Sequence, residues 1–191
     1  MSQPTWLALG DSYTIGEGVH PEERWPAQLA LLRQFSEPEY LAETGWTTVD
    51  LLEAMSHAEF ADHYDWVSVQ IGVNDQYDGL GTEAFREGLN KILNFAVHKV
   101  TDPHRVMVLS IPDYSVTTFA QNKEPERIAR EVALFNTIVE ELAALKHATY
   151  CDITALSQRA ADDPALLTDD DLHPSGKMYS LWAEKLSHHL S

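Results

Sequence analysis

Five short runs of apolar and β-branched residues are spread along the chain, and a longer amphipathic segment separates each run from the next. Runs such as "WVSVQI" and "RVMVLSI" are typical of interior strands that are covered on both faces. Strands that alternate with helices need right-handed crossovers, which place the strands parallel in one sheet. The predicted strands are Thr5–Leu9, Glu39–Ala42, Trp66–Ile71, Arg105–Ile111 and Thr149–Ile153.

The segments between the runs follow the 3.6-residue period of amphipathic helices. The clearest is 82–100, and Thr47 with Asp50 fits a capping box that opens another helix. Further helices are predicted over 25–35, from Pro125 onward and after Pro174. The sequence therefore predicts one α/β domain over residues 1–191, a three-layer α/β/α sandwich with a five-stranded parallel sheet, flavodoxin-like in its order of elements.

Charge and composition exclude several classes of partner. The net charge of −17 argues against nucleic acid and anionic membrane surfaces, because both would be repelled. No run of about 18 apolar residues is present, so we expect no membrane insertion. The N-terminus lacks the basic and apolar regions of a secretory signal, and the lone Cys151 cannot form an internal disulfide. These features predict a cytoplasmic protein.

In parallel sheets, reactive residues gather at the carboxyl ends of the strands. The first predicted strand is followed by Gly10-Asp11-Ser12, a strand-to-helix turn that exposes the serine hydroxyl near backbone N–H groups. Gly45 follows the second strand, and Asn74, whose amide can donate to a developing oxyanion, follows the third. Each residue alone also fits an ordinary turn or a helix N-cap, so both interpretations stay open at this point.

Near the C-terminus, a histidine follows three consecutive aspartates in "TDDDLHP". A carboxylate at Asp170, three residues before His173, can hold the imidazole in one tautomer. The same run also fits a solvated acidic loop, whereas the lack of glycine argues against a calcium loop. The remaining histidines have no ligand spacing with one another, so we expect no metal site.

Together, the ordered motifs "GDSYT", "TGWTT", "GVND" and "DLHPS" resemble the SGNH hydrolases, also called GDSL-type esterases and lipases. The resemblance covers nearly the whole chain. Single motifs of this set are modestly specific, but all four in order at strand ends are a strong signal. One departure is Tyr13, where the motif that names the family has leucine.

The resemblance implies a serine hydrolase that cleaves carboxylic esters through an acyl-enzyme on Ser12. It implies that His173 is the general base and that Asp170 orients it. The backbone N–H groups of Ser12 and Gly45 would form the oxyanion hole together with the Asn74 side chain. No cofactor is implied, and the partner is a small-molecule ester.

For the substrate, we expect a short acyl or acetyl ester in an open cleft, because the sheet and helices leave few residues for a lid. The longest predicted loops are 76–81 and 113–123. Trp46, directly after Gly45, and Asp11, directly before Ser12, are candidates for contact with the substrate.

Alternatives remain open at this stage. An acyl-thioesterase or an acyltransferase would use the same site, and a catalytically silent relative would serve as an interaction module. A nucleotide- or flavin-binding domain is disfavoured, because Gly16-Glu17-Gly18 places an acid where a phosphate would lie and lacks the third glycine of the dinucleotide motif.

Overall fold

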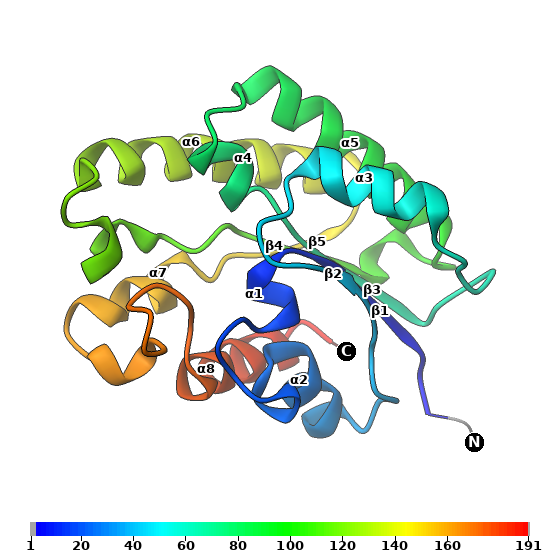
Figure 1. The fold of residues 1–191 in the computed structure, drawn as a ribbon. Helices are drawn as coiled ribbons and strands as arrows, with labels where there is room; N and C mark the ends of the chain where they lie inside the picture. Colours follow the sequence, from blue (N-terminus) through cyan, green and yellow to red (C-terminus); the bar gives the residue numbers. More distant parts are fainter. Residues whose placement is uncertain (1–2, 191) are drawn as a thin grey trace.

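The computed structural model describes residues 3–190, with a five-stranded sheet at its centre (Figure 1). The strands are β1 (Trp6–Gly10), β2 (Glu39–Ala42), β3 (Trp66–Gln70), β4 (Val106–Leu109) and β5 (Thr149–Cys151). Their order is β2-β1-β3-β4-β5, and every neighbouring pair is parallel. This is the order of flavodoxin-like sheets, whose switch point lies between β1 and β3. The prediction of a five-stranded parallel sheet is confirmed.

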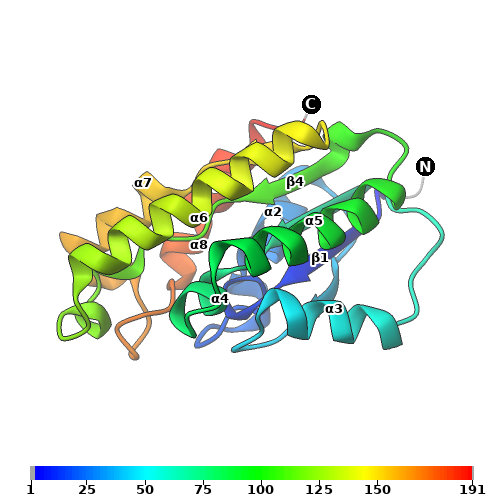
Figure 2. The same cartoon turned by 90° about the horizontal axis from the view of Figure 1, so that it is seen from above.

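Helices cover both faces of the sheet and complete the predicted three-layer sandwich (Figures 1 and 2). On one face, α2 (Trp25–Arg33) packs along α8 (Gly176–Ser187). The opposite face carries α3 (Thr48–His57), α5 (Thr82–His98) and α6 (Pro125–Leu145), with α5 in contact with both of the others. The long amphipathic segments thus form the helices that the 3.6-residue period predicts.

Some short elements differ from the sequence-based expectation. The structure adds three helices of four or five residues and six 3-10 turns, which are too short to show a hydrophobic period. They are α1 (Ser12–Ile15), α4 (Val73–Tyr77), α7 (Thr154–Ser157), η1 (Pro21–Glu23), η2 (Pro103–Arg105), η3 (Tyr114–Val116), η4 (Thr118–Ala120), η5 (Gln158–Ala161) and η6 (Pro164–Leu166).

The fourth strand is shorter than predicted, because the Asn136 side chain takes the backbone hydrogen bonds of Ile111 that a neighbouring strand would otherwise make. The backbone N–H of Ile111 donates to Asn136 Oδ1 at 2.7 Å, and Asn136 Nδ2 donates to the Ile111 carbonyl at 2.9 Å. Ile111 therefore stays buried without pairing to a neighbouring strand. Apolar character alone predicts a strand there, because it does not show where the hydrogen bonds go.

The central strands β1 and β3 are buried along their whole length, and Trp6 of β1 packs against Trp25 of α2. Trp6 and Trp25 pack 5.7 Å apart between ring centroids. Their indole N–H groups donate to Ser68 Oγ at 3.1 Å and to Gln70 Oε1 at 2.9 Å. Polar side chains on β3 thus satisfy the indole donors of Trp6 and Trp25.

The carboxyl ends of β1, β2 and β3 lie at one edge of the sheet, where the chain turns into α1, the 43–47 loop and α4. The loop between η6 and α8 returns to this edge. An antiparallel bridge between Leu167 and Pro174 closes its base. Across residues 3–190, no helix is both long enough and apolar enough to cross a bilayer.

The last residue of β1 generates a prediction about stability. A Cβ on Gly10 would overlap the Gln70 carbonyl oxygen and the Thr14 side chain. Because a backbone oxygen of a central strand cannot move aside, Gly10→Ala should lower the free energy of unfolding by about 1–3 kcal/mol or more.

Denaturant unfolding followed by circular dichroism measures this change. Gly81→Ala is the matched control, because no atom lies within 4 Å of the added Cβ and the backbone φ of −65° suits alanine. We expect the control to change stability by less than about 1 kcal/mol. Equal losses in the two variants would contradict the overlap argument.

Candidate active site

Ser12 is the first residue of α1 and lies directly beyond the end of β1. Asp11 has extended backbone angles and caps the helix, since its Oδ1 accepts a hydrogen bond from the Tyr13 N–H at 3.0 Å. This sharp turn brings the serine to the sheet edge although the residue is only 3% exposed.

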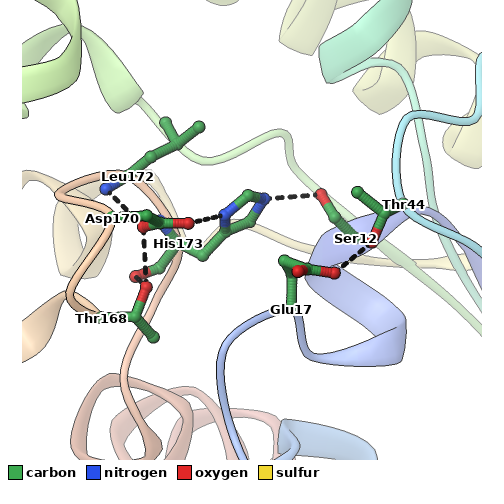
Figure 3. Close-up of polar contacts among 7 residues, drawn as sticks. All are labelled: Ser12, Glu17, Thr44, Thr168, Asp170, Leu172 and His173. Carbon is green, nitrogen blue, oxygen red and sulfur yellow. Dashed lines mark hydrogen bonds and ion pairs between the residues drawn. The ribbon is translucent and has the colours of Figure 1, made fainter.

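A chain of hydrogen bonds links Ser12 to two residues of the C-terminal loop (Figure 3). His173 Nε2 lies 3.0 Å from Ser12 Oγ, across a sequence separation of 161 residues. On the other side of the ring, His173 Nδ1 lies 2.5 Å from Asp170 Oδ2. With the proton held on Nδ1 by the carboxylate, Nε2 is free to accept the serine proton.

The Asp170 carboxylate also shapes the loop that carries the histidine. Its Oδ1 accepts from the Thr168 hydroxyl at 2.7 Å and from the Leu172 and His173 N–H groups at 2.9 Å each. Partial burial raises the pKa of Asp170, but these hydrogen bonds and the one from the His173 ring outweigh burial and hold the pKa well below its usual range. The carboxyl group is therefore ionised at neutral pH.

The two neighbouring acids do not take this position. Asp171 has a φ of +58°, and across residues 3–190 only Asp170 of the three has a side-chain hydrogen bond to His173. The separation of three residues is what lets one carboxylate meet both the ring and the backbone of His173.

The predicted oxyanion donors Gly45 and Asn74 border the same cleft as Ser12. Gly45 has a φ of +86°, a conformation that favours glycine. Asn74 lies in the first turn of α4, and its Nδ2 donates to the Trp46 carbonyl at 2.9 Å. An amide nitrogen carries two hydrogens, so the second remains available to an oxygen in the cleft.

Side chains from two helical segments hold the loop that carries Gly45. The Thr44 hydroxyl donates to Glu17 Oε2 at 2.5 Å, just after α1 (Figure 3). At the other end, Asp75 in α4 accepts from the N–H and the hydroxyl of Thr48 at 2.9 and 2.5 Å. The loop is thus fixed relative to both Ser12 and Asn74.

The cleft has a volume of about 170 Å³, and most of its side chains are apolar or aromatic. Its lining consists of Ser12, Tyr13, Thr44, Gly45, Val73, Asn74, Tyr77, Tyr114, Phe119, Leu172 and His173. The aromatic wall formed by Tyr77, Tyr114 and Phe119 is not among the site residues predicted from sequence. The one feature of the sequence that could have indicated this wall is that the three residues lie in the two longest predicted loops, 76–81 and 113–123.

Two predicted substrate contacts lie elsewhere. Trp46 is not among the residues that line the cleft: its side chain packs against the hydrophobic core, and its carbonyl holds the Asn74 amide. Asp11 is 1% exposed, because its carboxyl group turns inward to cap α1. Both residues support the site from behind.

Asp11 is an unusual carboxyl group. Burial raises the pKa of Asp11 to about 8, and the nearby Asp75 adds to the rise, while hydrogen bonds from backbone N–H groups oppose it only in part. Burial also raises the pKa of Asp75, against the hydrogen bonds from Thr48. Two buried acids that are close enough to interact thus both have raised pKa values. Within residues 3–190, no group of three or more His, Cys, Asp or Glu side chains is placed to hold a metal ion.

A serine at a strand end, bonded to a histidine that a carboxylate orients, is the arrangement of acyl-transferring serine hydrolases. Residues 8–181 match the model of the GDSL-like lipase/acylhydrolase family. The chain therefore belongs to this family and is a carboxylic ester hydrolase. No curated protein matches its sequence.

Solved structures share the fold at low sequence identity. Axe2, an acetylxylan esterase from Geobacillus stearothermophilus, has a TM-score of 0.76 at 20% identity, covering 100% of this chain and 95% of its own. A member of the lipolytic protein G-D-S-L family from Veillonella parvula DSM 2008 has a TM-score of 0.73 at 18% identity, covering 96% of both chains. The psychrotrophic esterase EstA from Pseudoalteromonas sp. has a TM-score of 0.70 at 17% identity, covering 98% of this chain and 96% of its own.

The buried Asp11 carboxyl predicts a particular dependence of stability on pH. In the unfolded chain the group ionises near 3.8, whereas in the folded protein it keeps its proton up to about pH 8. Folding thus takes up a proton between these values, and its contribution to stability is lost as pH rises through the window. Asp11→Asn keeps a good N-cap and removes the titration.

Urea unfolding at several pH values between 4 and 8 checks this expectation. The free energy of unfolding of the wild type should fall relative to that of the Asp11→Asn variant by up to about 1.4 kcal/mol per pH unit. Parallel pH profiles for the two proteins would show that Asp11 is not the titrating group.

Proposed function

We propose that this protein hydrolyses short-chain carboxylic esters through an acyl-enzyme formed on Ser12. The observation that carries the proposal is the hydrogen-bonded series from Asp170 through His173 to Ser12, which borders a small apolar cleft. An unassisted serine hydroxyl is a poor nucleophile at neutral pH, and a histidine at 3.0 Å supplies the base that it needs.

In the first half-reaction, Ser12 Oγ attacks the ester carbonyl carbon while His173 Nε2 takes the hydroxyl proton. The carbonyl π electrons move to the oxygen, and the new C–O bond completes a tetrahedral intermediate. The intermediate then expels the alcohol oxygen, to which His173 returns its proton. Asp170, which stays ionised, stabilises the imidazolium in between.

Three donors would hold the negative oxygen of the intermediate: the N–H groups of Ser12 and Gly45 and the second amide hydrogen of Asn74. Because the Trp46 carbonyl and the tethered loop already orient these donors, they need little rearrangement as charge develops. In the second half-reaction, water takes the place of Ser12 as nucleophile. His173 removes a proton from that water, and the acid leaves as Ser12 regains its proton.

The size of the cleft supports a short acyl group. Pockets for drug-sized ligands are typically about 300–1,000 Å³, and this cleft holds about 170 Å³. The structural neighbour Axe2 is named as an acetylxylan esterase, which agrees with a small acyl group.

A catalytically silent relative would not need an intact series of hydrogen bonds from carboxylate to serine.

The Ser12→Ala variant tests the nucleophile. We expect it to fold normally, to resist a fluorophosphonate probe and to lose about 10⁶-fold in kcat on p-nitrophenyl acetate. In the wild type, mass spectrometry should find the phosphonyl adduct on the peptide that contains Ser12. An adduct on another serine would sink the assignment, and best turnover on palmitate in an ester series would sink the short-chain preference.

The three aspartates before His173 offer a second test with built-in controls. Asp170→Asn keeps the shape of the side chain but allows the wrong imidazole tautomer, so kcat should fall by up to about 10⁴. Asp169→Asn should have little effect, as should Asp171→Asn, since asparagine tolerates the positive φ at that position. A crippled Asp171→Asn variant beside an active Asp170→Asn variant would contradict the proposed role.

A further inference from the structure

Three aromatic rings form one wall of the cleft, and they are held to different degrees. Tyr114 is 3% exposed, and its hydroxyl donates to Gln76 Oε1 at 2.7 Å, so this ring is fixed from within the protein. Tyr77 is 51% exposed at the end of α4, and Phe119 is partly exposed in η4. Their ring centroids lie 6.2 Å apart. Packing alone leaves these two rings room to move.

One cation holds these two rings together. Lys123 Nζ lies 3.9 Å from the Phe119 ring centroid and 4.9 Å from that of Tyr77, and it donates to the Tyr77 hydroxyl at 2.8 Å. The Lys123 N–H donates to the Ala120 carbonyl at 2.8 Å, which fixes the turn from which the side chain reaches back. Among residues 3–190, no carboxylate lies within ion-pair distance of this ammonium group. Its polar contacts are therefore directed at the wall.

A second hollow lies behind the same wall. It has a volume of about 290 Å³ and is bordered by Tyr77 and Tyr114 and by a largely polar set of side chains: Gln76, Asn122, Lys123, Glu124, Arg127 and Ile128. Tyr77 and Tyr114 also line the catalytic cleft, so the two spaces are separated by these rings. Movement of the Tyr77 ring into this polar hollow would lengthen the cleft by the space that the ring vacates, which lies beside Tyr114 and Phe119.

We propose that Lys123 is a positioning residue that sets the acyl-chain limit of the enzyme, by holding Tyr77 against Phe119 so that Tyr77 stays in the partition between the catalytic cleft and the second hollow. This inference rests on the proposed function, because it assigns the acyl group of the ester to the cleft. The assignment follows from chemistry: beyond its carbonyl, an alkyl acyl group has no hydrogen-bonding atoms, which suits a wall of aromatic and aliphatic side chains.

The Lys123→Met variant tests the partition, because methionine keeps an unbranched apolar stem and removes the charge and the donors. Kinetics are measured on p-nitrophenyl esters from acetate to decanoate, which share one leaving group. We expect the ratio of kcat/KM for octanoate to that for acetate to rise by about 2- to 10-fold. The gain should come mainly from a lower KM for octanoate rather than from a higher kcat, since Lys123 acts on the wall that the acyl chain contacts.

Two further variants separate this role from a general effect on stability. Lys99 makes a similar cation–π clamp on Phe60 and Phe95, at 5.7 and 5.4 Å from the ring centroids, and neither ring lines the cleft. Lys99→Met should therefore leave the octanoate-to-acetate ratio at the wild-type value. Lys123→Arg keeps a cation above the rings and should restore most of the short-chain preference.

An unchanged ratio in Lys123→Met, or an equal change in Lys99→Met, would overturn the proposal. kcat/KM is also measured on acetate esters of different alcohols. If Lys123→Met changes kcat/KM only in that series, the wall contacts the alcohol part of the ester and the assignment of the acyl group to the cleft is wrong. Crystal structures give a readout that is independent of turnover. The Tyr77 ring should shift toward the second hollow in Lys123→Met and stay in place in Lys123→Arg, and an unmoved ring in Lys123→Met would overturn the partition.

Failure of the proposed function would give a different result from failure of the proposal for Lys123. It would appear as hydrolysis that persists in Ser12→Ala, whatever the behaviour of the Lys123 variants.

Discussion

The parallel pairing of β1 with both of its neighbours is the constraint on which the site depends. Because all three strands run in the same direction, the residues that follow them emerge at one edge of the sheet. This register brings Ser12, Gly45 and Asn74 to one cleft from three separate parts of the chain. His173 needs only one returning loop to join them, and the bridge between Leu167 and Pro174 closes the base of that loop.

The sequence predicts this edge well because its signals are local. Each buried strand is a continuous apolar run, and polar residues stand at the point where the run stops, so the sheet and the candidate residues can both be read in order. The choice of Asp170 among three acids also follows from spacing, since its carboxylate meets both the ring and the backbone N–H of His173.

The parts that sequence does not predict depend on contacts between distant segments. The fourth strand ends early because Asn136, on α6, takes over the hydrogen bonds of Ile111. The aromatic wall joins Tyr77 at the end of a five-residue helix to Phe119 in a 3-10 turn, and neither element has a period to detect. Sequence also does not show that the Trp46 carbonyl orients the Asn74 amide, because that contact joins two separate loops.

The hydrogen bond from Asn74 to the Trp46 carbonyl means that the side-chain entropy of Asn74 is lost during folding and not during catalysis. A free asparagine amide samples several rotamers, and ordering a side chain of this kind costs a sizeable fraction of a kcal/mol or more. Here one amide hydrogen already donates to the Trp46 carbonyl in a neighbouring loop, so folding fixes the side chain in one rotamer. Ordering this donor therefore lowers the free energy of unfolding, and the same cost is not added to the activation free energy of each turnover.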